Sequence, residues 1–532
     1  MRMFIVVVGV LAAHQAFACG GLFCSQVSPT PVDQRAERIL FEILGDGTVA
    51  ATVEIRYEGD PRAFSWIVPV SGTPDFVGVA PKDTLQLLDA ATQVSITPPQ
   101  TICTNPPFQM PSFGCADALG NAPIADVGVG AGGAGGVNVT AYPSVGPFDD
   151  IVVVEGTDPT VLMQWLTDHE FQVNDQMRPF IEQYTVEGYK FLATKLQASA
   201  DVKDMVPIRF HCPQPFPEIP LRLTAIAAEP EMGFTVFVAG PQRYTLSGNY
   251  SEVALATDDL QTGGGVTNYF ALVSKRIDDA GGLGFVVERA QPSATVSALV
   301  ANTFLGTDTE ADARTNLDGI FSTRAFVTRF YGRMDPEEMI EDPQFVPGNG
   351  GGFDGTFDLS GRTVEACPAT GAPPAPVGPP ACGTLYCGSG DACATSDLGD
   401  GCVCRNGHLA RTINAPGGGL QVVCTSPAID LHAGTNACAT TNCGAAGTCV
   451  PVNDRPTCAC ADGNVAVVDG AAVTCAPIKG PVFESDQILW PAPPKDLPAP
   501  AGGCGAAHVG GAASIALWFG AVAVVRRVLR RR

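Results

Sequence analysis

The stretch CGTLYCGSGDACATSDLGDGCVC, residues 382–404, and the stretch CATTNCGAAGTCVPVNDRPTCAC, residues 438–460, decide how this chain is built. In both, five cysteines are separated by four, five, eight and one residues, and each set closes at a sixth cysteine after a looser loop, at Cys424 and at Cys475. An internal repeat of this kind indicates two copies of one small structural unit. Twelve of the nineteen cysteines of the chain fall in these two copies.

The spacing resembles that of the EGF-like module, including a glycine three residues after the fifth cysteine, at Gly407 and at Gly463. The resemblance implies that the first cysteine pairs with the third, the second with the fourth and the fifth with the sixth. The implied pairs are Cys382–Cys393, Cys387–Cys402, Cys404–Cys424, Cys438–Cys449, Cys443–Cys458 and Cys460–Cys475. Each closed loop contributes roughly 3 kcal/mol in the simplest entropic picture, which modules too small for a sufficient core require.

The residues around the cysteines bear on whether these modules hold a metal. A structural zinc site is the alternative to disulfides, but no Cys-x-x-Cys pair and no nearby pair of histidines supports it. Calcium-binding EGF modules carry acidic residues before the first cysteine, whereas residues 379–381 are Pro-Pro-Ala and residues 435–437 are Thr-Asn-Ala. We therefore expect disulfides, with no metal and no cofactor.

Composition limits the architecture and the partners. The 532 residues, 45% of them hydrophobic, leave room for one large domain beside the small modules. Glycine and proline number 60 and 44, which predicts long loops and linkers. The net charge of -23 makes nucleic acid a poor partner.

The amino-terminal residues 1–18 are typical of a secretory signal peptide. Arg2 precedes an apolar run at residues 4–13, and Ala16-Phe17-Ala18 forms a small-x-small cleavage site. Cleavage after Ala18 would leave Cys19 first. An acylated lipoprotein is the alternative, but Ala16 stands where such proteins usually carry leucine.

The carboxyl-terminal residues 504–532 predict a membrane anchor. Cys504 is followed by an apolar run at residues 509–525 and then by five arginines. Seventeen residues at about 1.5 Å each reach roughly 25 Å, the lower limit for a membrane span, and the arginines would stay on the cytoplasmic side. This order resembles the MYXO-CTERM sorting signal, which implies cleavage near Cys504 and attachment at the cell surface. An uncleaved tail anchor is the alternative.

The cysteines outside the two modules number seven. Six of them can pair among themselves and are predicted to be further disulfide cysteines: Cys19, Cys24, Cys103, Cys115, Cys212 and Cys367. The odd one is Cys504, which agrees with its being processed. Removing both predicted signals removes six arginines and no acid, so the mature charge would be 25 minus 54, or minus 29.

Hydrophobic periodicity predicts an α+β fold, mainly an antiparallel sheet, for the large domain at residues 19–347. Strands are expected at 39–44 and 48–57, joined by a Gly45-Asp46-Gly47 turn, and at 64–70, as a meander with one buried face. The opposite face, with Thr48, Thr52, Glu54 and Arg56, is expected to face solvent. Helices are predicted at 85–91, after Asp158-Pro159, at 175–187 and at 336–340, and further strands at 151–155, 189–196, 207–211, 221–228 and 234–239.

Several segments of this domain resemble the bacterial secreted family catalogued as domain of unknown function 2330. The likeness rests on Cys-Gly-Gly-x-Phe-Cys at 19–24, Ala-Glu-Arg at 36–38, Phe-Ser-Trp-Ile-Val-Pro-Val at 64–70, Ile-Pro-Leu-Arg-Leu-Thr-Ala at 219–225, and a late block from Thr328-Arg329 to Asp342-Pro343. The resemblance implies a secreted or surface domain and supplies no activity.

Signatures of known enzyme classes are missing from the sequence. His169-Glu170 begins a zinc-protease pattern, but Val173 replaces the required second histidine. Gly128, Gly130 and Gly133 match a dinucleotide fingerprint only in spacing, since glycine-alanine low complexity and a β-prone run surround them. His211-Cys212 could suggest a thiol nucleophile, yet adjacent residues of a strand point to opposite faces. We therefore expect no catalytic residue and no metal site, with His169 at a helix end or on the surface.

The remaining segments complete the predicted organisation. A Gly/Pro-rich linker spans 348–381, the modules span 382–424 and 438–475, and a proline-rich stalk spans 476–503. The sequence thus favours an exported, membrane-anchored protein of the cell envelope or outer surface, non-enzymatic, serving display, adhesion or recognition of an extracellular protein or polysaccharide. The alternative is a secreted hydrolase with a non-standard active site in residues 19–347.

Overall fold

The computed structural model describes residues 33–58, 64–102, 137–171, 173, 177–197, 199–200, 204–226, 228–260, 262–263, 266–365, 385–388, 390–414, 420–425, 438–452 and 455–484. The predicted signal peptide, the 128–136 glycine segment and the predicted sorting segment 504–532 lie outside these residues. Among the residues described, no helix has the length and apolar character needed to cross a membrane.

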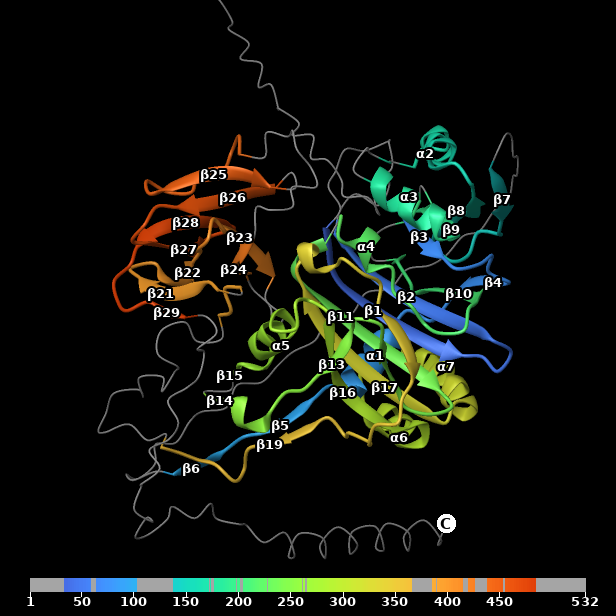
Figure 1. Ribbon diagram of the computed structural model, residues 1–532. Helices are drawn as coiled ribbons and strands as arrows, with labels where there is room; N and C mark the ends of the chain where they lie inside the picture. Colours follow the sequence, from blue (N-terminus) through green and yellow to red (C-terminus); the bar gives the residue numbers. More distant parts are fainter. Residues whose placement is uncertain are drawn as a thin grey trace, which may run out of the picture. The chain divides into compact units, whose positions relative to one another are not determined.

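A mixed eight-stranded sheet forms the centre of the large domain (Figure 1). Its order is β13 (Ser251–Val253), β16 (Gly284–Pro292), β17 (Phe326–Met334), β11 (Ala228–Gly240), β1 (Asp33–Ile43), β2 (Thr48–Glu58), β10 (Ile208–Pro213) and β4 (Phe76–Val79). Two neighbouring pairs, β1 with β11 and β13 with β16, are parallel, and the other pairs are antiparallel. The predicted sheet-rich fold with antiparallel pairing is therefore confirmed.

The turn between β1 and β2 is the hairpin that its sequence predicts. Gly47 adopts a φ of 84°, which favours glycine, and the Thr48 backbone N–H donates to Asp46 Oδ1 at 3.0 Å. The register that follows places Val49 opposite Ile43 and Val53 opposite Ile39. Apolar side chains of both strands therefore share one face of the sheet.

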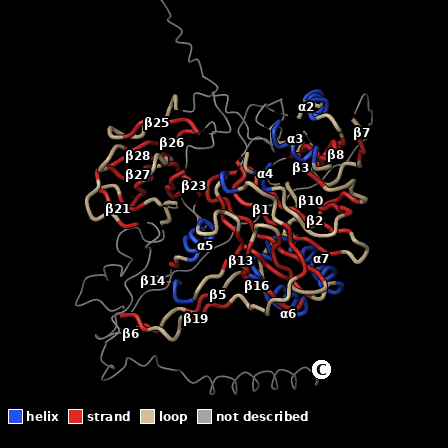
Figure 2. Tube along the Cα trace, in the orientation of Figure 1, coloured by secondary structure: helices blue, strands red, loops and turns tan. Residues whose placement is uncertain are grey.

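Helices α1 (Thr84–Thr92), α6 (Ser293–Asn302) and α7 (Glu310–Thr323) cover the other face of this sheet (Figure 1; α6 and α7 also in Figure 2). Their apolar side chains form one buried cluster with the sheet: Leu40, Phe237, Ala239 and Val327 from strands, and Leu85, Leu88, Val296, Val300, Leu317 and Phe321 from helices. The expectation that Thr48, Thr52, Glu54 and Arg56 face solvent is wrong for the first three: Thr48 and Thr52 are buried, and Glu54 bonds to Arg38. The side chain of Arg56 lies outside those described. Helices α6 and α7 were not expected from the sequence.

A chain of ion pairs runs along this helix-covered face. Arg38 bonds to Glu54 and to Asp89 of α1, both at 3.0 Å, and Arg329 bonds to Asp89 at 2.8 Å and to Glu288 at 2.5 Å. The chain links β2, β1, α1, β17 and β16 through alternating charges. Buried charges require such pairing, because an unpaired one would be costly.

A second, antiparallel sheet contains β3 (Ser65–Val70), β9 (Lys190–Leu196), β8 (Phe148–Glu155) and β7 (Asn138–Ala141) in that order, accompanied by α2 (Pro159–Asp168) and α3 (Arg178–Val186). Asp158 caps α2 by accepting the Thr160 backbone N–H at 2.8 Å, as predicted. The predicted meander is wrong at its third strand, because β3 pairs with β9 and β2 pairs with β10 instead. Alternation predicts a strand but does not specify its neighbour.

Residues 221–228 were expected to form a strand, and this is also wrong. Leu221–Thr224 form one helical turn, α4, and β11 begins at Ala228. The carboxylate of Asp342, from a distant segment, accepts the Arg222 backbone N–H at 3.1 Å and so stabilises the turn. Smaller elements complete the domain: α5 (Tyr269–Asp278), η3 (Thr257–Asp259), η4 (Pro336–Glu338), the pair β12 (Tyr244–Ser247) and β18 (Gln344–Pro347), and the pair β14 (Thr262–Gly263) and β15 (Val266–Thr267).

The predicted linker from residue 348 begins later than expected. Phe353 forms a bridge with Ala290, and β19 (Thr356–Asp358) pairs in parallel with β5 (Ser95–Thr97). In the smaller of the two compact units, β20 (Thr363–Glu365) pairs in parallel with β6 (Gln100–Ile102). Residues 353–358 therefore belong to the larger unit, where they pair with earlier segments of the chain.

The two cysteine repeats share their sheets. One sheet has the order β28 (Ala472–Pro477), β27 (Asn464–Asp469), β22 (Gly399–Val403), β21 (Ala392–Ser396) and β29 (Phe483–Glu484). The other has the order β24 (Leu420–Thr425), β23 (Leu409–Asn414), β26 (Arg455–Cys460) and β25 (Gly447–Val452). Each sheet thus joins a hairpin of the first repeat to a hairpin of the second. Residues 476–484 were expected to belong to a stalk, but β28 extends to Pro477 and Phe483 of β29 pairs with Cys393.

The first repeat pairs with the second through the same positions that the second uses to pair with the first. Cys402, the fourth cysteine of the first repeat, pairs with Ala466, and Cys458, the fourth cysteine of the second, pairs with Ala410. Ala410 and Ala466 both lie six residues after the fifth cysteine of their repeat. The repeats also form one buried cluster that contains equivalent residues of both copies. Cys387, Cys402, Ala410, Val422 and Cys424 of the first repeat are equivalent to Cys443, Cys458, Ala466, Val473 and Cys475 of the second, in that order. The two copies therefore form one approximately two-fold unit with a common core.

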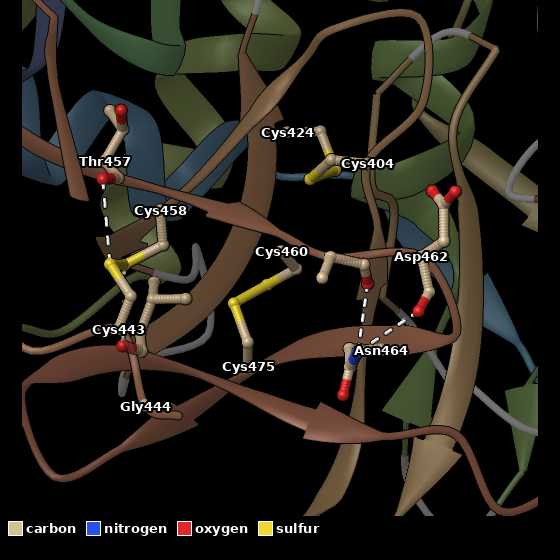
Figure 3. The surroundings of a disulfide bond; sticks show 12 residues. Cys404, Cys424, Cys443, Gly444, Thr457, Cys458, Cys460, Asp462, Asn464 and Cys475 are labelled. Carbon is tan, nitrogen blue, oxygen red and sulfur yellow. Dashed lines mark hydrogen bonds between the residues drawn. A yellow bond between two sulfur atoms is a disulfide. The ribbon is translucent and has the colours of Figure 1, made fainter. Parts of the chain in front are cut away.

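Five disulfides tie this unit together: Cys387–Cys402, Cys404–Cys424, Cys438–Cys449, Cys443–Cys458 and Cys460–Cys475. Figure 3 shows three of these pairs, Cys404–Cys424, Cys443–Cys458 and Cys460–Cys475. They coincide with five of the six pairs that the spacing resemblance implies. Cys393 is also disulfide-bonded, and its implied partner Cys382 lies outside the described residues. The alternative of a zinc site is wrong for these cysteines, because a sulfur held in a disulfide cannot act as a thiolate ligand.

Candidate functional site: a cavity between the two sheets

A cavity of about 50 Å³ lies between the eight-stranded sheet and β3. Its floor is formed by side chains of β1, β2 and β10, and its opposite wall by β3 and by the segment that follows β10. The lining residues are Glu37, Ile39, Phe41, Val49, Ala51, Val53, Trp66, Val68, Pro69, Val70, Phe210, Cys212, Gln214, Glu218, Ile219 and Pro220. Three of the segments that carry the family resemblance, 36–38, 64–70 and 219–225, contribute to this lining.

Strand alternation explains why the floor is apolar. Val53 lies between Ile39 and Ile208 in the register of the sheet, and Ala51 lies between Phe41 and Phe210. Side chains two residues apart on a strand share a face, so these residues all point toward β3. Trp66 of β3 is 3% exposed, and its ring centroid lies 6.5 Å from that of Phe210 across the space.

Polar side chains stand at the margins of the cavity. Glu37 is buried, Glu218 is half-buried, and Gln214 accepts a hydrogen bond from Ser71 Oγ at 2.7 Å. The Glu218 carboxylate accepts hydrogen bonds from the Tyr189 hydroxyl and from Gln344 Nε2. Burial raises the pKa of Glu218, and the two donors oppose that shift in part.

Cys212 was predicted to be a disulfide cysteine, and this prediction is wrong. Its thiol is free and buried in the cavity lining, and the sulfur lies 4.0 Å from the Gly72 carbonyl oxygen. Burial raises the pKa of the thiol to about 12, so the unreactive protonated form dominates at neutral pH. The other predicted cysteines, Cys19, Cys24, Cys103, Cys115 and Cys367, lie outside the described residues.

His211 does not act with Cys212, as its strand position predicts. It lies on the opposite face of β10, with its ring 4.6 Å from that of Phe76 and Nδ1 3.6 Å from Asp75 Oδ1. Burial and the neighbouring Arg209 lower the pKa of His211. No proton path from the thiol to this imidazole follows from such an arrangement.

His169 ends helix α2, which confirms its predicted position. Its ring stacks on Trp165 with centroids 3.8 Å apart, and Nδ1 lies 2.8 Å from the Trp165 carbonyl oxygen. These contacts account for the orientation of the imidazole ring. Within the described part of the chain, no group of histidine, cysteine and acidic side chains is arranged to hold a metal ion.

A brace that was not predicted from the sequence supports one end of the cavity, although Arg222 and Asp342 both lie in segments that carry the family resemblance. The Arg222 guanidinium bonds to both carboxylate oxygens of Glu187 at 2.8 Å and to Asp342 Oδ2 at 2.6 Å, and it lies 4.3 Å from the Tyr184 ring centroid. These residues join α3, α4 and the segment before β18. Since Arg222 follows Ile219 and Pro220, the brace fixes part of the cavity wall. Partners 35 and 120 positions apart cannot be paired from one sequence.

The site combines an apolar interior with carboxylate and amide oxygens, and it lacks a paired nucleophile and base among the described residues. A cavity with these walls is suited to binding a small apolar group. No curated protein and no solved structure matches this chain. The family described as uncharacterized protein conserved in bacteria matches over residues 13–346, more than half of the 532 residues. The chain therefore belongs to that bacterial family, DUF2330.

Proposed function

We propose that this protein is exported and anchored at the cell surface, where it serves display, adhesion or recognition without catalysing a reaction. The observation that carries the proposal is the set of five disulfides within residues 387–475. Disulfides of this density form and persist in oxidising compartments outside the cytoplasm. The secretory signal predicted at residues 1–18 supports the same location.

The finer organisation belongs to the same proposal. The repeats at 382–424 and 438–475 are EGF-like modules, and residues 504–532 act as a MYXO-CTERM-type sorting signal that is cleaved near Cys504. The membrane is then a partner through this anchor. The large domain recognises an extracellular protein or polysaccharide, or a component of one.

The hydrolase alternative finds little support in the side chains described. His169 and His211 each have stacking and polar contacts of their own, and the Cys212 thiol is buried in its protonated form. A hydrolase would need a nucleophile or an activated water within hydrogen-bond reach of a base. Recognition requires only the apolar cavity and its polar margin.

Surface labelling tests the location. Cells that produce the full chain are treated with a membrane-impermeant protease or antibody, beside cells that produce a chain ending at residue 503. We expect the full chain to be accessible and cell-bound, and the shortened chain to appear in the medium. A full chain that is protected in intact cells and released only on lysis would contradict the proposal.

A pull-down tests recognition against catalysis. Soluble residues 19–500 are used as bait in envelope and matrix extracts, with the His169→Ala and His211→Ala variants in parallel. We expect both variants to stay folded and to capture what the unaltered domain captures. A histidine variant that stays folded but loses all activity would favour the hydrolase.

A further inference from the structure

The cavity between the sheets carries two carboxylates although its walls are apolar. Among the described residues, its lining contains Glu37 and Glu218 and no lysine, arginine or histidine. Glu37 is only 7% exposed. A ligand that enters therefore meets the carboxylate oxygens of both glutamates, which accept hydrogen bonds.

The walls favour an apolar chain beside that charge. Trp66, Val68 and Val70 line one side, and Ile39, Val53 and Phe210 line the floor. Aromatic and aliphatic walls attract the methylene groups of an alkyl chain, and an aromatic ring also favours a neighbouring cation. Such a cavity discriminates against a free carboxylate or phosphate, which the two glutamates would repel.

We propose that this cavity binds an alkylammonium group, with its methylene chain against Trp66 and Val68 and its nitrogen toward Glu37 and Glu218. The proposal rests on the recognition function and states the chemistry of the group recognised. The volume of about 50 Å³ limits the bound part to a short chain. The group is either a free alkylamine or a lysine side chain of an extracellular protein.

The glutamates do not have to be unpartnered for this role. Glu218 accepts from Tyr189 and from Gln344, and each carboxylate oxygen has a second lone pair for a further donor. These two donors also fix the carboxylate in place, which reduces the ordering that binding would require. Protonation of Glu218 at low pH would weaken binding, since its charge would be lost.

Binding is measured by calorimetry and by ligand-observed NMR on the full chain purified in detergent. The probes are n-butylammonium, the neutral n-butanol of matching chain length, and Nα-acetyl-lysine N-methylamide. We expect n-butylammonium to bind about tenfold or more tightly than n-butanol, because a desolvated charge pair exceeds a neutral hydrogen bond by at least that factor. Equal affinity of the two probes, or no saturable binding of the ammonium at millimolar concentration, would overturn the proposal.

The source of the amine follows from the third probe. Binding of the blocked lysine comparable to that of n-butylammonium would support a lysine side chain, while rejection of the blocked lysine with retained n-butylammonium binding would support a free amine. Either result upholds the alkylammonium proposal.

Variants separate the site from general charge. Glu218→Gln and Glu37→Gln each remove one carboxylate and should weaken n-butylammonium binding about tenfold or more. Glu182→Gln, at an exposed position of α3, is the matched control and should bind normally. Ala51→Val fills the floor of the cavity without altering its charge and should also abolish binding. This variant therefore tests the site even if a glutamate variant fails to fold. Unchanged affinity in folded Glu218→Gln and Ala51→Val would refute the site. A chain displayed at the surface that binds no amine would refute this site alone and leave the proposed function standing.

Discussion

Replacing Gly401 by alanine tests whether the two cysteine repeats depend on a common core. A Cβ at this position would lie 2.0 Å from the Ala466 carbonyl oxygen and 2.6 Å from Val467 Cγ1, although Gly401 belongs to the first repeat and both neighbours belong to the second. Ordinary contact begins at 3.4 Å, so the strands must separate by about 1.4 Å, the difference between 3.4 and 2.0 Å. The substitution therefore acts on the interface between the repeats.

The expected cost has two parts. Overpacking costs about 1 to 3 kcal/mol, and weakening the bridge between Cys402 and Ala466 costs about 1 kcal/mol more. We expect the free energy of opening to fall by about 2 to 4 kcal/mol. Gly480→Ala is the matched control, because its Cβ would meet no atom within 4 Å, and it should change stability by less than about 0.5 kcal/mol.

Amide hydrogen exchange of the full chain, read by mass spectrometry, measures this opening segment by segment. Gly401→Ala should speed exchange in residues 399–414 and also in residues 455–477 of the second repeat. Faster exchange confined to residues 399–404, with the second repeat unchanged, would show that the repeats are independent and would refute the reasoning.

Three further outcomes follow from the contacts described. Trp66→Ala should lower the free energy of unfolding by about 3 to 5 kcal/mol by chemical denaturation, because it enlarges the cavity at a buried site, whereas His211→Ala should cost less than about 1 kcal/mol. Arg222→Ala should lower the free energy of unfolding by about 3 kcal/mol or more, because it leaves Asp342 buried without its charged partner. Arg222→Lys should recover only part of this stability, because lysine lacks the planar fork of arginine. Equal stability of all three proteins would contradict the brace. The hydrogen bond from His408 to Asp391 raises the pKa of His408 above 6.5, so its stabilisation is complete below that pH and is lost as pH rises through the raised pKa. Between about pH 6 and pH 9, hydrogen exchange at residues 390–409 of the unaltered chain should therefore accelerate more than the intrinsic exchange rate does. His408→Gln should remove this additional acceleration.

The local features that the sequence predicted depend on neighbouring residues. The Gly47 turn, the Asp158 cap and the repeated cysteine spacing each lie within a short stretch whose geometry those residues impose. Alternation on β10 likewise predicted that His211 and Cys212 point to opposite faces.

The features that the sequence did not predict depend on distant partners. The neighbour of β2 is β10, about 150 residues later, and the helices whose apolar side chains pack with those of the sheet begin at Thr84, Ser293 and Glu310. The Arg222 brace converts a stretch with strand propensity into a helical turn through Asp342. The cavity was missed for the same reason, because its lining comes from four separated segments. Long-range pairing of this kind leaves no periodic trace in one sequence.

The most direct test of the account is the redox and processing state of the protein recovered from intact cells. Cells are treated with an impermeant alkylating reagent, and the protein is digested without reduction for mass spectrometry. We predict linked peptides for the repeats, an amino terminus at Cys19, and no peptide beyond Cys504. Repeat cysteines recovered as free thiols would contradict an exported protein, and a recovered peptide containing Ala512 to Arg526 would contradict the sorting signal.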